Sequence, residues 1–221
     1  MPSPDARPSL EILEAHRGPE DDATDLLKLV TDRGTVLGRF HPAPGDAAIL
    51  WVFGTGGGLG GPAGGLYSRL GARLQPKGVA SLELDYRRPG ELRACVQDVL
   101  LGLTWLRSEG KSRIVLVGHS FGGAVVISAA LHSDLAVGVA ALSSQTAGTA
   151  DVGLLSPRPL LLIHGSADEI LPDACSRDIF ARAGEPRELI LYPGCRHGLD
   201  QCREALDRDL LAWLSRVLVA S

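Results

Sequence analysis

Six short apolar runs separated by helical stretches constrain the fold of this chain more than any other feature. The runs cover residues 48–53, 79–84, 113–118, 137–142, 159–164 and 188–192. Short runs that are apolar throughout, with helices between them, are typical of parallel strands that are buried on both faces. The sequence therefore predicts an α/β fold, with a mostly parallel sheet of about eight strands and helices on both of its faces.

The remaining pattern supplies the helices and the start of the sheet. Helices are predicted over residues 63–75, 90–108, 121–132, 172–183 and 201–219. Residues 26–31 and 35–41 alternate in polarity around a glycine-containing turn and predict an antiparallel hairpin. We expect residues 1–24 to be an N-terminal extension that contains a short strand over 9–16, and residues 25–221 to be a single domain.

Charge and hydropathy exclude several classes of protein. The chain has 22 Lys and Arg against 26 Asp and Glu, and no block rich in basic residues. Neither nucleic acid nor an anionic membrane is therefore expected as a partner. No run approaches the roughly 18 apolar residues of a membrane span, and the N-terminus is rich in proline and charge where a signal peptide would be apolar. We expect a soluble, cytoplasmic protein.

The cysteines give no sign of a disulfide framework or a metal site. The chain has four cysteines, which are too few for a disulfide framework in 221 residues, and no two of them form a C-x-x-C pair. They are Cys95, Cys175, Cys195 and Cys202. We expect reduced thiols. The spacing of Cys195, His197 and Cys202 matches no zinc pattern, so neither a metal nor a cofactor is predicted.

A G-x-S-x-G motif at residues 118–122 is the strongest functional signal. The motif alone is weak evidence, because a chain with this many glycines and serines is expected to contain about 0.25 such motifs by chance. Its context strengthens it: the strand 113–118 ends at the motif and the helix 121–132 begins directly after it. The glycines permit a tight turn. Ser120 is therefore expected to stand above the sheet, at the positive end of a helix.

A serine nucleophile needs a base, and the base needs an acid that orients it. Asp168 follows the strand 159–164, and His197 follows the strand 188–192. Both residues lie beyond the carboxyl ends of their strands, where open α/β sheets bind ligands. The chain order Ser120, Asp168, His197 therefore predicts a catalytic triad.

At these residues the sequence resembles the α/β-hydrolase family. The resemblance covers about residues 26–219 and rests on GHSFGG at 118–123, HGSADEILP at 164–172 and CRHG at 195–198. It implies Ser120 as nucleophile, His197 as general base and then acid, and Asp168 as the residue that orients His197. It also implies an eight-stranded sheet whose second strand is antiparallel.

The resemblance further implies an oxyanion hole, made by the amide after the nucleophile and an amide after the third strand. Phe121 supplies the first amide. For the second amide, the predicted strand 48–53 ends in FGTGGG at 53–58, without the His-Gly that the family often shows at this place. Thr55 aligns best with the second donor, and Gly56 is next. The expected substrate-binding residues are Gly54, Gly57 and His119.

Only sixteen residues, 143–158, separate the strands at 137–142 and 159–164, which leaves no room for a cap domain. The resemblance is therefore to small cap-less members such as short-chain carboxylesterases and dienelactone-hydrolase-like proteins. Dienelactone hydrolases use a cysteine nucleophile, whereas this chain has Ser120. The predicted activity is hydrolysis of carboxylic esters or thioesters of small molecules through an acyl-enzyme.

Two alternatives remain. Gly56, Gly58 and Gly61 satisfy G-x-G-x-x-G, and the acidic residues Glu83 and Asp85 follow at the distance expected of a dinucleotide-binding site. However, eight glycines in the twelve residues 54–65 match many glycine patterns. An acid at the end of a strand, such as Asp85, more often accepts hydrogen bonds from loop amides than takes part in catalysis. The other alternative is a non-catalytic protein of the hydrolase fold that binds a ligand or a partner.

Overall fold

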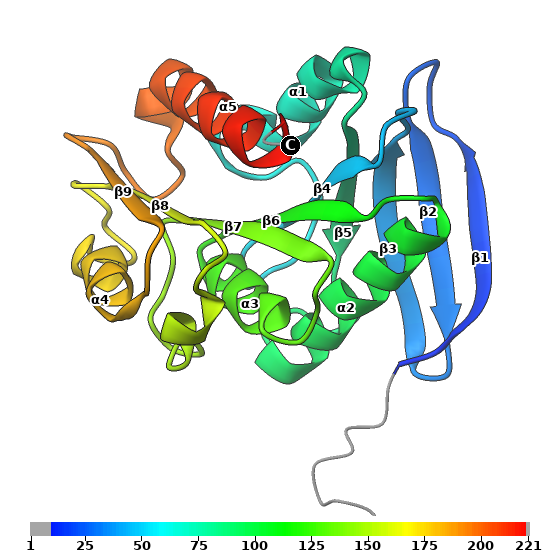
Figure 1. Ribbon diagram of the computed structural model, residues 1–221, viewed down its shortest axis with the longest axis horizontal. Helices are drawn as coiled ribbons and strands as arrows, with labels where there is room; N and C mark the ends of the chain where they lie inside the picture. Colours follow the sequence, from blue (N-terminus) through cyan, green and yellow to red (C-terminus); the bar gives the residue numbers. More distant parts are fainter. Residues whose placement is uncertain (1–9, 220–221) are drawn as a thin grey trace, which may run out of the picture.

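A single mixed sheet of nine strands organises the protein, in a computed structural model that describes residues 10–219 (Figure 1). The spatial order of the strands is β1-β2-β3-β5-β4-β6-β7-β8-β9. The strands are β1 (Ile12–Pro19), β2 (Asp25–Thr31), β3 (Gly34–His41), β4 (Ala47–Val52), β5 (Ala80–Asp85), β6 (Arg113–His119), β7 (Ala136–Leu142), β8 (Leu160–Gly165) and β9 (Arg187–Tyr192). The six strands β5, β4, β6, β7, β8 and β9, in this spatial order, pair in parallel. This confirms the predicted mostly parallel sheet.

Five α-helices cover the two faces of the sheet. They are α1 (Pro62–Leu74), α2 (Leu92–Ser108), α3 (Phe121–Ala130), α4 (Ala174–Arg182) and α5 (Arg203–Val219), joined by the short 3-10 helices η1 (Gln75–Lys77), η2 (Val152–Leu155) and η3 (Asp200–Cys202). Figure 1 shows α1 and α5 on one face and α2, α3 and α4 on the other. Each predicted helix is present, and its ends lie within two residues of the predicted ends.

The antiparallel part of the sheet is one strand larger than the predicted hairpin. β3 pairs antiparallel with both β2 and β5, as expected for the second strand of the hairpin. β1 then adds a further antiparallel edge on β2. It lies three residues later than the strand expected over 9–16, because its side chains are almost all exposed and give no alternating pattern to read.

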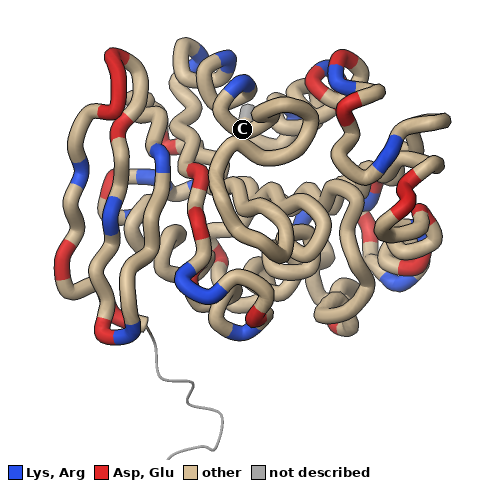
Figure 2. Tube along the Cα trace, turned by 180° about the vertical axis from the view of Figure 1, so that it is seen from behind, with Lys and Arg blue, Asp and Glu red and all other residues tan. Residues whose placement is uncertain are grey.

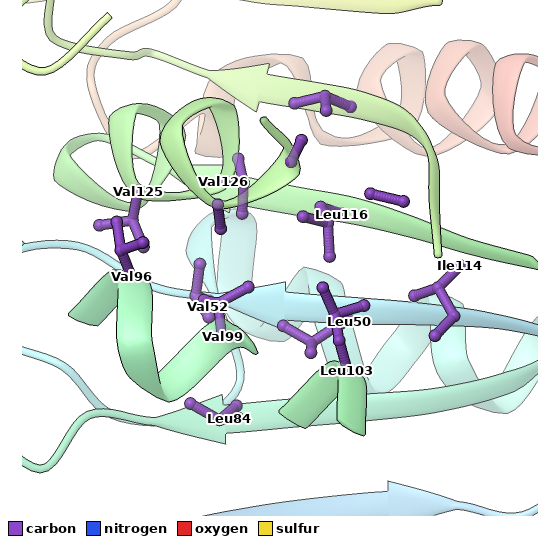
Figure 3. Close-up of a cluster of buried hydrophobic side chains, with 14 of the residues drawn as sticks. Leu50, Val52, Leu84, Val96, Val99, Leu103, Ile114, Leu116, Val125 and Val126 are labelled. Atoms are coloured by element: carbon purple, nitrogen blue, oxygen red, sulfur yellow. The ribbon is translucent and has the colours of Figure 1, made fainter. Parts of the chain in front are cut away.

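Alternate side chains of the central strands build two apolar layers. Leu50 and Val52 of β4 pack toward α2 and α3, together with Leu116 and Val125 (Figure 3). The intervening Trp51 belongs to the layer under α1 and α5. Because both faces are covered, every residue of β4 is buried. This explains why the strand appears in the sequence as an unbroken apolar run.

The register of the central strands brings several loops to one edge of the sheet. His119 of β6 pairs with Leu142 of β7, and Leu142 pairs with Ile163 of β8. The residues that follow each of these in the chain therefore start their loops at the same level. Any side chains that emerge from the ends of β6, β8 and β9 have a short path to one another.

Charge is spread over the molecule rather than gathered at one place. In Figure 2, Lys and Arg are interspersed with Asp and Glu over the whole trace. Ion pairs such as Arg39 with Glu20 and Arg69 with Asp207 join charges of opposite sign. In residues 10–219, no helix has both the length and the apolar character needed to cross a bilayer.

Candidate active site

A strained turn between β6 and α3 presents Ser120. Its backbone has φ 58° and ψ −122°, a conformation that is uncommon for a residue other than glycine. The turn is so tight that a Cβ added to Gly118 would overlap the backbone of Gly122, and one added to Gly122 would overlap the carbonyl of Phe53. The predicted strand, turn and helix are therefore all present, with Ser120 at the apex of the turn.

Hydrogen bonds connect Ser120, His197 and Asp168 in a row. The Nε2 atom of His197 lies 3.0 Å from the Oγ of Ser120, and its Nδ1 lies 2.7 Å from Oδ2 of Asp168. The carboxylate accepts from Nδ1–H, which leaves the Nε2 lone pair to accept from the serine hydroxyl. The side chain of Asp168 is fully buried, and that of His197 is 16% exposed. The three residues that the sequence singled out thus lie in contact.

Backbone amides fix the orientation of Asp168. Its Oδ1 accepts hydrogen bonds from the amides of Ile170 (2.9 Å) and Leu171 (2.8 Å). Burial alone would raise the pKa of Asp168, but the amide of Leu171, the side chain of His197 and the amide of Ile170 outweigh it, so this pKa is lowered. Asp168 is therefore an anion at neutral pH, with its other oxygen, Oδ2, directed at His197.

His119 lies beneath the loop that carries His197. Its ring centroid is 4.8 Å from the ring of His197, and its Nε2 is 2.9 Å from the carbonyl oxygen of His197, to which it donates. The residue was predicted to line the substrate site, but only 4% of it is exposed. It supports the backbone of His197 from inside the protein.

The buried state of His119 leads to a prediction about acid stability. Burial lowers the pKa of His119 to about 4, below its ordinary value of about 6.5. Between these values the unfolded chain binds the proton more tightly, so stability falls as the pH drops. Linkage gives a loss of about 2 kcal/mol from pH 7 to pH 5. Thermal unfolding at both pH values measures it.

The control for this prediction is His119→Gln, which keeps a side-chain donor near the carbonyl of His197 and does not titrate. Its melting temperature is expected to fall less between pH 7 and pH 5 than that of the wild type. Equal falls in the two proteins would show that other groups cause the acid sensitivity.

The glycine-rich loop after β4 passes beside Ser120 and is held by carboxylates of β5. The Cβ position of Gly54 lies 3.7 Å from Cβ of Ser120. Asp85 accepts a hydrogen bond from the amide of Gly58, and Glu83 accepts one from the amide of Gly60, both at 2.6 Å. This confirms the expectation that Asp85 bonds loop amides.

The same contacts weigh against a dinucleotide site in the loop. A dinucleotide-binding acid must be free to bond a ribose hydroxyl. Glu83 is instead buried and accepts hydrogen bonds from Gly60 and Ser68, and Asp85 accepts from both Gly58 and Tyr86. Neither carboxylate is available for a ribose without release of the loop.

The residues expected to form the oxyanion hole belong to two segments that adjoin Ser120, the start of α3 and the glycine-rich loop. Phe121 is the first residue of α3, so its amide is among those that have no acceptor within the helix. Thr55 and Gly56 are exposed on the glycine-rich loop, and Gly54 and Gly57 flank them. The amide of Ala63 bonds the carbonyl of Gly198, so this loop and the His197 loop are also joined.

The prediction of four reduced thiols is wrong for one pair. Cys195 and Cys202 form a disulfide, with their Cα atoms 5.9 Å apart, while Cys95 and Cys175 are free. The turn through Leu199 brings the two cysteines together, and their separation of seven residues gave no sign of it. Within residues 10–219, no group of three or more His, Cys, Asp or Glu side chains is arranged to hold a metal ion.

A second histidine, which the sequence did not single out, contacts Asp168. His164, in β8, lies with its Nε2 3.1 Å from Oδ2 of Asp168. In the sequence it is the last residue of the apolar run 159–164, four residues before Asp168. That spacing was the one available signal.

No family model matches the chain. One curated relative is the uncharacterized protein YfhR of Escherichia coli K12, which is 26% identical over 216 residues, with 81% of this chain and 75% of the relative covered. Solved structures with a similar fold match a larger share of this chain than this relative does.

Two of those structures carry names that describe an enzyme class. The α/β hydrolase GrgF from a Penicillium species superposes with a TM-score of 0.74 at 16% identity, over 89% of this chain and 99% of its own. A dienelactone hydrolase from Anabaena variabilis gives 0.71 at 15% identity, over 95% and 99%. In the described residues, the connection from β7 to β8 holds only η2 as a helix, so no cap domain interrupts it. The chain therefore has the α/β-hydrolase fold in its cap-less form.

Proposed function

We propose that the protein is a serine hydrolase that cleaves carboxylic esters or thioesters of small molecules through an acyl-enzyme on Ser120. The observation that carries this proposal is the row from Ser120 Oγ to His197 Nε2 (3.0 Å) and from His197 Nδ1 to Asp168 (2.7 Å), at the strained turn before α3. Such a row activates a hydroxyl that is otherwise a weak nucleophile.

In the first half of the reaction, Ser120 Oγ attacks the carbonyl carbon and His197 Nε2 takes its proton. The amides of Phe121 and Thr55, with Gly56 as the second choice, stabilise the negative oxygen of the tetrahedral intermediate. The bond to the leaving alcohol or thiol then breaks, and His197 gives that group its proton. Asp168 stabilises the imidazolium that forms between these two transfers.

In the second half, a water molecule attacks the acyl group on Ser120 and His197 takes its proton. The new tetrahedral intermediate collapses, the acid leaves, and the proton returns to Ser120. This sequence needs no metal and no cofactor. Gly54 carries no side chain at the point where the glycine-rich loop passes Ser120, which suits a substrate that approaches along this loop.

The comparisons support the reaction class and leave the substrate to experiment. GrgF is named as an α/β hydrolase, and the Anabaena protein is named for a lactone, which is a cyclic ester. Ester cleavage by Ser120 is consistent with both names. A small substrate also suits a chain in which nothing described covers the site as a cap domain would.

The test is covalent labelling with a fluorophosphonate probe, followed by intact-protein mass spectrometry and peptide mapping. We expect one adduct, on Ser120, and a much slower reaction in His197→Ala. A panel of p-nitrophenyl esters of increasing acyl length then defines the preferred chain. Folded protein that forms no adduct would favour the non-catalytic, ligand-binding alternative.

A second prediction concerns Asp85, which holds the glycine-rich loop. Its Oδ1 accepts from the amides of Gly58 (2.6 Å) and Tyr86 (2.8 Å). Asp85→Ala frees the loop that carries Thr55, so we expect kcat/KM to fall about tenfold, because a displaced donor stabilises the oxyanion less. Asp85→Asn keeps an acceptor oxygen and is expected to retain most of the activity. A wild-type kcat/KM in Asp85→Ala would contradict this role.

A further inference from the structure

His164 is a fully buried titratable residue that the proposed chemistry does not use. It is the penultimate residue of β8, and none of its surface is exposed. Its Nε2 lies 3.1 Å from Oδ2 of Asp168 and 3.0 Å from the carbonyl oxygen of Leu171. Its Nδ1 lies 2.7 Å from the Oγ of Ser176, on α4. Both ring nitrogens therefore have partners.

These partners determine where the proton of His164 resides. Nε2 faces a carboxylate oxygen and a carbonyl oxygen, both of which only accept, so Nε2 must carry hydrogen. The Oγ of Ser176 is the hydrogen-bond partner of Nδ1, on the other side of the ring. His164 thus directs an N–H at Asp168, and Ser176 holds the ring in that orientation.

The carboxylate of Asp168 is consequently surrounded by four N–H donors. Oδ1 accepts from the amides of Ile170 and Leu171, and Oδ2 accepts from His197 Nδ1 and His164 Nε2. The two amides hold one oxygen, and the two imidazoles share the other. Without His164, Oδ2 would be held in place by His197 alone, the residue that it has to orient.

We propose that His164 is a positioning residue, which holds Oδ2 of Asp168 at the point where His197 Nδ1 can reach it and so keeps His197 Nε2 aligned with Ser120. This inference rests on the proposed function. His164 does not touch the reacting atoms. It acts through Asp168, and its effect is therefore expected on the rate of acylation of Ser120 rather than on substrate binding.

A pair of amide variants separates this role from a structural one. His164→Gln places a side-chain N–H₂ near the position of Nε2 and so restores donation to Asp168. His164→Asn places its polar group near the position of Nδ1, beside Ser176, and leaves Oδ2 without that donor. Both variants bury a neutral amide, and the melting temperature of each shows how far a loss of stability contributes.

The readouts are kcat and KM for a p-nitrophenyl ester, the rate of fluorophosphonate labelling at Ser120, and the melting temperature. We expect His164→Asn to lower kcat and the labelling rate roughly 10- to 100-fold, with KM within about threefold, because small misplacements of a catalytic group cost rates of this order. His164→Gln is expected to recover to within about fivefold of the wild type.

Several outcomes would overturn the inference. Equal losses in the two variants, or wild-type rates in His164→Asn, would show that donation to Asp168 does not matter. If neither variant folds, Ser176→Ala decides, because loss of the hydrogen bond that orients the His164 ring should still lower kcat several-fold at constant KM, and an unchanged kcat contradicts the role. Wild-type protein that does not label at Ser120 contradicts the proposed function together with this inference. Normal labelling of both wild type and His164→Asn contradicts the inference alone.

Discussion

Ser120→Ala is expected to lower kcat for ester hydrolysis by at least about 10⁴-fold. The variant removes the hydroxyl oxygen that contacts His197 Nε2, so no acyl-enzyme can form. Its fold should be intact, because alanine and serine both carry a Cβ and experience the same strain at φ 58°. The measurements are esterase activity, the fluorophosphonate adduct and the melting temperature.

The matched control is Ser112→Ala. Ser112 is exposed, precedes β6 at its amino end and therefore lies at the opposite end of that strand from Ser120. We expect wild-type activity and a normal adduct from this variant. Retention of more than a tenth of the activity by Ser120→Ala would refute the acyl-enzyme mechanism.

Gly122→Ala is expected to damage both the fold and the activity. An added Cβ would overlap the carbonyl of Phe53 and lie 2.9 Å from the oxygen of Val52, so the start of α3 must move away from the end of β4. Overpacking of this kind costs about 3 kcal/mol, which for a chain of this length lowers the melting temperature by roughly 6–12 °C. The movement also separates Phe121 from the glycine-rich loop, so we expect an activity loss of about 100-fold or more.

The direction of the change in stability of Gly122→Ala distinguishes crowding from helix propensity. Helix propensity alone would make the alanine variant more stable than the glycine by up to about 1 kcal/mol, so a large loss can only come from crowding. Gly18→Ala is the control, because nothing lies within 4 Å of the Cβ that it would gain. A melting temperature of Gly122→Ala equal to that of the wild type would show that the turn tolerates a Cβ.

The parallel part of the fold could be predicted because burial on both faces leaves a direct trace in the sequence. β4 and β8 are buried at every position, and each appears as an apolar run. The candidate site could be predicted for a related reason: Ser120, Asp168 and His197 each follow such a run. The carboxyl ends of parallel strands share one edge, so strand order alone gathers their loops.

Features that depend on contacts distant in the sequence could not be predicted. β1 is exposed along most of its length, and its position depends on pairing with β2 rather than on its own composition. The environment of His119 depends on how the loop after β9 folds over β6. The hydrogen bond between His164 and Ser176 joins β8 to α4, and neither residue type specifies such a partner.

The disulfide between Cys195 and Cys202 makes the segment around His197 a covalent ring. A small ring has few conformations in any state of the protein, so bringing His197 to Ser120 costs less conformational entropy than it would from an open loop of the same length. Cleavage of the disulfide by a reductant gives the loop more conformations and so raises the entropic cost of placing His197. A comparison of kcat with and without reductant measures the effect of this cost on the reaction. Because such bonds persist in oxidising surroundings and are reduced in others, the surroundings of the protein help to determine how readily its candidate active site assembles.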